Sequence, residues 1–275
     1  MESPEARKNL GSFPLVKLHR TIPERSFLPA DEAEVRQKMK QTFKHRQELV
    51  HNPERSTNVF KTFPRFLDVK GLVNQDFVLL FNAETSAKLL EQWETAFKQK
   101  VIKEAKSHTL TAELQSHISA AENQHSENGW DSDMSSILLL LHLLPPSAGR
   151  KKVKISPLDA VDRLVQYHKS CTSIEEHLSG REGHQPYLLA VGRVKKRIDN
   201  FYVVVDKQLI PCAGTSSLSA IDELFKAHYV FNLTYEESLA NVYTFLQTTV
   251  YNIDIGITSA SPRVRELRVK LLNNV

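Results

Sequence analysis

The stretch PYLLAVGRVKKRIDNFYVVVDKQLIPC, residues 186–212, decides the fold class of this chain. Two runs rich in β-branched and aromatic residues, 187–191 and 201–205, flank a basic connector and predict two paired strands. Residues 208–212 follow a turn at Asp206-Lys207 and predict a third strand. Clear strand patterns are confined to this region, so the sequence predicts one small antiparallel sheet.

Helical patterns dominate the chain on both sides of that region. In the most regular of them, Leu90, Trp93, Phe97 and Val101 recur at spacings of three and four residues. Capping residues and prolines mark several helix ends. The expected helices are 31–50, a short one within 72–81, 83–106, 110–122, 131–144, one that starts at Ser156 and buries Leu158, Val161, Leu164 and Val165, one after Ser216 or Ser219, and one capped by Thr234 and Glu237.

Strands clustered in one place favour an α+β fold, in which a helix-rich lobe is followed by a small antiparallel sheet packed with helices. We divide the chain into four parts: a basic, partly disordered N-terminal segment with one helix (1–57), a helical lobe (58–148), an α+β lobe (149–252) and a basic C-terminal tail (253–275). The tail contains an amphipathic turn with Val264, Leu267 and Leu271 on one side.

Composition sets limits on the class of protein. The hydrophobic content of 41% and charged content of 25% are those of a soluble globular chain. The longest apolar run, Ile137–Leu144, is far shorter than the roughly 20 residues that span a bilayer. The N-terminus has no secretion signal, and two cysteines form no disulfide framework. We therefore expect an intracellular protein, cytoplasmic or nuclear, with no membrane contact.

One group of side chains has the residue types of a metal site. His168 and Cys171 are three residues apart at the expected end of the helix that starts at Ser156, and Glu175, Glu176, His177 and His184 follow. There is no second cysteine pair, and the ligands would span an irregular stretch. We expect ordinary surface polar residues here, with no metal and no cofactor.

Nucleophilic or acid–base catalysis has equally weak signals. Cys212 lies at the end of a predicted strand, which suits a nucleophile, but nothing fixes a partner base, and packing explains it as well. His142 lies in an apolar helix, where a hydrogen-bonded core histidine is expected. The acidic pair Asp131 and Asp133 sits where a helix start favours acids, and Glu175-Glu176 fits a solvated surface. Phosphate-loop, dinucleotide, serine-hydrolase and zinc-protease motifs are absent. We therefore expect a protein that is not an enzyme.

Basic side chains form two short clusters that could contact anions or a nuclear import receptor. The net charge is +4, and its excess lies at the chain ends, where residues 1–60 hold 11 lysines and arginines against 8 acids. No aromatic residues alternate with the clusters to stack bases. The candidate contacts are Arg150, Lys151, Lys152 and Lys154 in a linker, and Arg193, Lys195, Lys196 and Arg197 in the hairpin loop.

Four blocks of sequence point to a known family. They are FPRFLDVKGLVNQDF (63–77), WDSDMSSILLLLHLLPP (130–146), PYLLAVG with FYVVVDKQLIPC, and AIDELFKAHYVFNLTYEESLANVYTFLQ (220–247). In order and spacing they resemble the C-terminal region of fish proteins similar to sterile alpha motif domain-containing protein three, over about residues 60–250. The resemblance implies a shared fold and an adaptor-like setting, and it carries over no active site. The helices before residue 60 are too few for a sterile alpha motif.

These observations favour a non-enzymatic protein whose partner is another protein. The helix 31–50 and the hairpin loop 193–199 are the expected contact elements. Two alternatives stay open at this point: a nucleic-acid-associated protein that uses its basic ends and loops, and a cryptic hydrolase with Cys212 as nucleophile.

Overall fold

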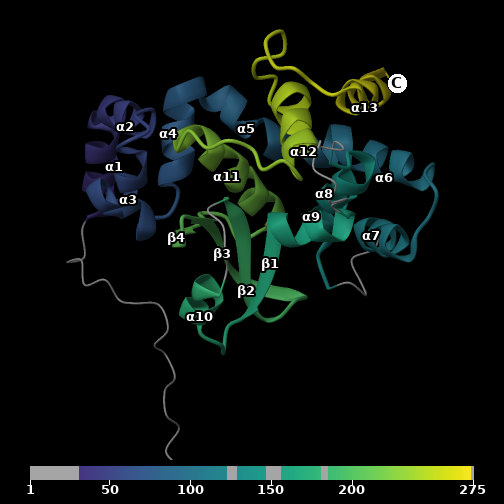
Figure 1. The fold of residues 1–275 in the computed structure, drawn as a ribbon, viewed down its shortest axis with the longest axis horizontal. Helices are drawn as coiled ribbons and strands as arrows, with labels where there is room; N and C mark the ends of the chain where they lie inside the picture. Colours follow the sequence, from purple (N-terminus) through teal and green to yellow (C-terminus); the bar gives the residue numbers. More distant parts are fainter. Residues whose placement is uncertain (1–30, 123–128, 147–155, 181–184, 274–275) are drawn as a thin grey trace, which may run out of the picture.

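A computed structural model describes residues 31–122, 129–146, 156–180 and 185–273 (Figure 1). It confirms an α+β fold, in which helices pack against one four-stranded sheet. The strands are β1 (Val165–Lys169), β2 (Tyr187–Val194), β3 (Arg197–Val205) and β4 (Gln208–Pro211). The α-helices are α1 (Glu32–Gln41), α2 (Phe43–Val50), α3 (Val59–Thr62), α4 (Leu72–Phe81), α5 (Ala83–Gln92), α6 (Lys98–Lys106), α7 (Ala112–Glu122), α8 (Ser132–Leu143), α9 (Pro157–Leu164), α10 (Ile174–Ser179), α11 (Ser217–Val230), α12 (Ala240–Phe245) and α13 (Pro262–Asn273).

Four short helical turns complete the chain path. Two are 3₁₀ turns, η1 (Ser56–Asn58) and η2 (Pro64–Leu67), and two are π turns, η3 (Trp93–Phe97) and η4 (Leu246–Val250). The turn η3 lies between α5 and α6, inside the segment predicted as one helix over 83–106. The last helix starts at Ala240, after Leu239, so the expected capping box at Thr234 and Glu237 is wrong.

The sheet is mixed, which corrects the antiparallel prediction. Its order is β1-β2-β3-β4; β2, β3 and β4 pair antiparallel as expected, whereas β1 pairs parallel to β2, with Val165 opposite Leu188. Residues of β1 were expected at the end of the helix that starts at Ser156. That helix, α9, ends at Leu164 because Val165 adopts an extended backbone, and β1 then pairs with the edge of β2. Leu158, expected in the buried stripe of this helix, is half exposed. The pairing partner lies more than 20 residues away, so the helical periodicity of α9 did not reveal it.

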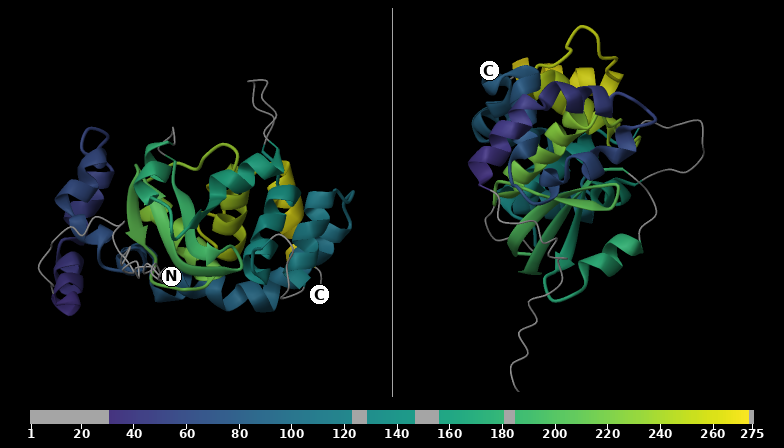
Figure 2. Two further views of the ribbon diagram at one scale, coloured as in Figure 1. Left: turned by 90° about the horizontal axis from the view of Figure 1, so that it is seen from below. Right: turned by 90° about the vertical axis from the view of Figure 1, so that its left-hand side faces the viewer.

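Both faces of the central strand are covered. Leu188 and Ala190 of β2 join the main core, whereas Tyr187, Leu189 and Val191 join a second cluster with Ile174 of α10. This accounts for the continuous apolar run in β2, because a strand buried on both faces shows no alternation of polar and apolar residues. Figure 2 shows α10 beside the sheet, away from the other helices.

The main core is one continuous cluster that runs from Val35 in α1 to Leu271 in α13. At its centre α11 packs against β2, β3, α4, α5 and α8. Ser216 caps this helix as predicted: its hydroxyl accepts a hydrogen bond from the Ser219 amide at 3.2 Å. Figures 1 and 2 show α1–α3 at one end of the molecule, α6, α7 and α13 at the other, and α11 between them.

The N-terminal helices pack on this body through one buried ion pair. The segment expected as a single helix over 31–50 is divided at Thr42 into α1 and α2. Arg46 of α2 donates from Nε to Asp76 Oδ2 at 2.8 Å and from Nη2 to Oδ1 at 2.7 Å. The Arg46 and Asp76 residues are 1% and 0% exposed, and Asp76 belongs to α4. This two-point contact fastens α2 to α4.

At the other end of the chain the expected basic tail contains the helix α13. Val264, Leu267 and Leu271, placed together by the sequence pattern, are buried against α12 and its surroundings. The ammonium group of Lys100 in α6 donates to the Leu271 carbonyl at 2.7 Å and holds the far end of α13. In the described parts of the chain, no helix has the length and apolar character needed to cross a bilayer.

Candidate functional site at the C-terminal helix

Half of the basic residues singled out in the sequence can be placed. Arg150, Lys151, Lys152 and Lys154 lie outside the described residues. The other cluster forms the turn between β2 and β3, where Arg193, Lys196 and Arg197 are exposed.

Lys195, the remaining residue of that cluster, is partly buried. The Lys195 ammonium lies 4.5 Å from the centre of the Trp130 ring, and its stem passes over Gly129. This burial lowers the pKa of Lys195. The aliphatic stem of Lys195 therefore helps attach the hairpin to the helical part of the molecule.

The expected metal-like group does not assemble into a ligand set. His168 lies on β1 and not at a helix end; its Nε2 is 3.1 Å from both the carbonyl and the hydroxyl of Thr172. Its ring centre is 5.1 Å from that of His177, while Cys171 is exposed. Among the residues that the structure describes, no three metal-ligating side chains converge. His184 lies outside that set.

Cys212 is buried against the sheet at the end of β4. Burial raises the pKa of its thiol, and the nearby Glu223 carboxylate raises it further. A nucleophilic cysteine needs the opposite shift, toward the thiolate. The environment of Cys212 is therefore that of a core residue.

The other candidate groups have structural partners. His142 lies 5.6 Å from His117, ring centre to ring centre, and burial lowers the pKa of both. Asp131 caps α8 by accepting from the Met134 amide at 2.8 Å, and it also accepts from the Ser217 hydroxyl. Asp133 accepts from Lys98 at 2.8 Å. Glu175 and Glu176 lie exposed in the first turn of α10.

A buried ionic cluster between α4 and α11 was not found from the sequence. Asp222 accepts from Lys226 and from the Tyr251 hydroxyl, each at 2.5 Å, and Lys226 also donates to Asn74 at 3.0 Å. The spacing of four residues between Asp222 and Lys226 could have predicted this ion pair, because side chains four residues apart in a helix are neighbours.

Next to this cluster, Glu223 accepts from the Ala213 amide at 2.9 Å. Burial raises the pKa of Glu223 to about 7. These buried charges tie α11 to its neighbours and to the start of its own connecting loop.

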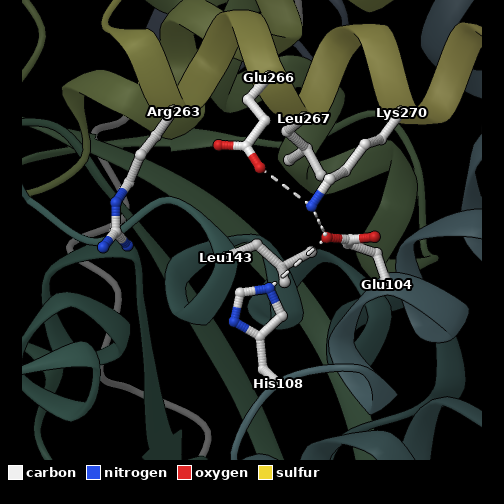
Figure 3. A pocket seen from close by; sticks show the side chains of 7 residues that line it. All are labelled: Glu104, His108, Leu143, Arg263, Glu266, Leu267 and Lys270. Atoms are coloured by element: carbon white, nitrogen blue, oxygen red, sulfur yellow. Dashed lines mark hydrogen bonds and ion pairs between the residues drawn. The ribbon is translucent and has the colours of Figure 1, made fainter.

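Two pockets flank α13, and they differ in charge balance. The first, of about 220 Å³, lies between α13 and the helices α6 and α8 (Figure 3). Lys270 donates to Glu104 at 2.7 Å and to Glu266 at 3.0 Å, and His108 lies 3.6 Å from Glu104. The Glu104 and Glu266 carboxylates raise the pKa of Lys270. The ammonium group is thus neutralised by its neighbours, and the pocket is a charge-balanced seam between helices.

The second pocket, of about 270 Å³, lies on the opposite flank of α13. The loop before the helix contributes Ile255, Thr258, Ser259 and Ala260, η4 contributes Thr248, and α13 contributes Val264, Arg265 and Arg268. In the described parts of the chain, no carboxylate forms an ion pair with Arg265 or Arg268. Two uncompensated guanidinium groups beside hydroxyl groups create a positive pocket.

Exposed apolar side chains lie on the same loop and helix that line this second pocket. Ile255 is half exposed, and Ile257, two residues later, is 87% exposed. On α13 the positions 265, 268, 269 and 272 form one helical stripe because they are spaced by three and four residues. Val269 and Leu272 are exposed on that stripe. We define the α13 face as Ile255, Ile257, Arg265, Arg268, Val269 and Leu272.

Comparison with known proteins supports the resemblance drawn from the sequence. The model of a family described as sterile alpha motif domain-containing protein 3, helical domain, matches residues 18–69. The chain is therefore similar to that family over the segment that contains α1, α2, α3 and η2. This match lies mostly before the blocks on which the resemblance rests, and the two overlap at residues 63–69. No curated protein and no solved structure matches the chain significantly.

Proposed function

We propose that the chain is a non-enzymatic, intracellular interaction protein that binds another protein through the α13 face. Its similarity to the helical domain of sterile alpha motif domain-containing protein 3 supports an adaptor-like role. Both cysteines are free thiols, which fits a reducing compartment.

The observation that carries the proposal is the exposure of apolar side chains on the α13 face. The side chain of Ile257 is almost entirely exposed to solvent, so its burial does not contribute to the stability of the fold. Ile255, Val269 and Leu272 add exposed apolar area on the same loop and helix. Apolar area interspersed with arginine is typical of protein contact surfaces.

The two contact elements expected from the sequence, the helix 31–50 and the hairpin loop 193–199, offer less exposed apolar surface. The exposed side of α1 carries charged and polar residues, whereas its apolar residues Val35 and Met39 are buried. The hairpin turn exposes Val194, but Lys195 beside it is used against Trp130. The α13 face is therefore the better candidate for contact with a partner.

The non-enzymatic part of the proposal rests on how the perturbed ionisable groups are used. Asp76 is buried in an ion pair with Arg46 that joins α4 to α2, and Asp222 is buried in an ion pair with Lys226 within α11. The raised pKa of Cys212 disfavours the thiolate that a hydrolase would need. Each of these groups has a packing or pairing role that accounts for its environment.

Site-specific photo-crosslinking tests the proposal. A benzoylphenylalanine residue is placed at Ile257, with Lys40 in α1 and Val194 in the hairpin as control positions. After irradiation in cells we expect a discrete protein adduct at position 257, identified by mass spectrometry. Binding of that protein, once purified, is expected to be lost in an Ile257→Ser, Leu272→Ser variant of the whole chain. An absence of adducts at 257, or the same adducts at all three positions, would overturn the proposal.

A further inference from the structure

We infer that the pocket between the loop 255–260 and α13 binds a phosphomonoester group on a segment of the partner protein. The inference rests on the proposed function, because it assigns the chemistry by which the α13 face recognises that partner. It concerns the second pocket described above, which is distinct from the charge-balanced seam shown in Figure 3.

The lining of the pocket supplies donors and positive charge together. Arg265 and Arg268 project from successive turns of α13, three residues apart, so their guanidinium groups lie on one side of the helix. Guanidinium groups bind phosphate oxygens through two parallel hydrogen bonds. Two of them match the charge of about −1.5 to −2 that a phosphomonoester carries.

Hydroxyl groups add to this donor set. The Thr258 hydroxyl accepts from the Gln247 side chain at 3.0 Å, which leaves its own hydrogen for a ligand. Ser259 is exposed at the pocket. In contrast, the Thr248 hydroxyl donates to the Thr244 carbonyl at 2.8 Å and serves as part of the wall.

The two flanks of α13 provide an internal comparison. On the flank toward α6, Lys270 is held between Glu104 and Glu266. On the flank toward the loop, Asp254 is the acid that precedes α13, and its carboxylate accepts a hydrogen bond from the Gln247 amide at 3.4 Å. Arg265 and Arg268 have no ion-pair partner among the described residues, and an external dianion would supply one.

Size and charge favour a phosphorylated protein segment over a membrane. Surfaces that bind anionic lipids use clusters of about 4–8 lysines and arginines. The pocket has two, and Glu266 on the same helix and Asp254 in the loop offset part of their charge. A single dianion held in a pocket of about 270 Å³ fits this arrangement better than a diffuse layer of headgroups. Ile255 in the pocket lining and the exposed Ile257 in the same loop suit apolar residues that flank the phosphorylated position.

The test uses O-phosphoserine as probe and the arginine side-chain Nε–H signals in NMR spectra of the whole chain. We expect saturable shifts of Arg265 and Arg268, with no shift of Arg263, which lies on the other flank. Arg268→Gln is expected to weaken phosphoserine binding at least about tenfold, because charged hydrogen bonds are lost. Arg263→Gln removes the same charge from the same helix and is expected to leave binding unchanged.

Four results would overturn the inference. Acetate at equal ionic strength could produce the same shifts, or the shifts could spread to Arg263. Alternatively, the chain could sediment with phosphatidylserine vesicles through Arg265 and Arg268 while phosphoserine causes no shift. The Arg265→Gln, Arg268→Gln variant could lose phosphoserine binding and still form the crosslink at position 257. That result would refute the phosphate site alone. Phosphoserine binding without any crosslink would instead remove the proposed function.

Discussion

Replacement of Asp76 by asparagine tests how the N-terminal helices are held. The substitution keeps the size of the side chain but leaves the Arg46 guanidinium buried without a counterion. Arg46 donates to both Asp76 oxygens at 2.7–2.8 Å, and neither residue is accessible to solvent. Breaking a fully buried ion pair by removing one partner typically costs about 3–5 kcal/mol. We therefore expect Asp76→Asn to lower the free energy of unfolding by about that amount.

A double substitution separates the ion pair from its other contacts. Arg46 also donates to the Met39 carbonyl at 2.5 Å and to the Thr42 hydroxyl at 2.7 Å. In Arg46→Met, Asp76→Leu the unpaired charge is gone, but the Met39 carbonyl loses a donor, which costs about 1–3 kcal/mol. The double variant should thus be more stable than Asp76→Asn.

Urea unfolding followed by circular dichroism measures these differences. The matched control is Asp68→Asn, which breaks the partly exposed Arg65–Asp68 pair and should cost at most about 1 kcal/mol. If Asp76→Asn lost no more than Asp68→Asn, the argument that this pair fastens α2 to α4 would be refuted.

Three further predictions concern the interior and the sheet. Burial raises the pKa of Glu223 from 4.5 to about 7, so the folded chain holds this proton more tightly than the unfolded chain; its contribution is complete below pH 4.5 and is lost as the pH rises through 7. The free energy of unfolding of the wild type should therefore fall by roughly 3 kcal/mol over that pH range relative to Glu223→Gln, as measured by urea unfolding at each pH. Parallel curves of unfolding free energy against pH for the two proteins would contradict the raised pKa. A Cβ at Gly192 would lie 2.2 Å from the Arg197 carbonyl oxygen, so Gly192→Ala should lower the thermal midpoint by an amount equivalent to about 1–3 kcal/mol. Gly256→Ala, whose Cβ would meet nothing within 4 Å, should leave the midpoint unchanged, and equal midpoints for the two variants would argue against the close contact at Gly192. A thiol reagent should label the exposed Cys171 rapidly in the native chain and Cys212 only on unfolding; rapid labelling of Cys212 would revive the hydrolase alternative.

Local signals predicted the helix ends and the hairpin well. Ser156 and Asp159 form the capping box that the sequence indicated, and Asp131 and Ser216 cap α8 and α11. In the hairpin, Phe201 pairs with Ala190, within the two runs quoted first. These features depend on residues close together in the chain, so the sequence contains most of the information that determines them.

Features that depend on distant residues were missed. β1 forms only because β2 offers it an edge, and a helical stripe through Leu164 and Val165 concealed it. The same holds for the buried position of Arg46, because its ion-pair partner Asp76 belongs to a different helix, α4. The α13 face escaped notice because its apolar residues are spaced as a second stripe beside the buried one. Which stripe faces the core is decided by packing against α12.

The central claim is that buried charges hold the fold together, while the arginines of the α13 face remain available for a partner. One matched pair of variants tests it directly: Arg46→Gln and Arg265→Gln, compared by urea unfolding in the same buffer. We expect Arg46→Gln to lose about 3–5 kcal/mol, because Asp76 stays buried without its partner, and Arg265→Gln to change by less than about 0.5 kcal/mol. A comparable loss in both variants would show that Arg265 belongs to the structural framework, and the division of roles would be wrong.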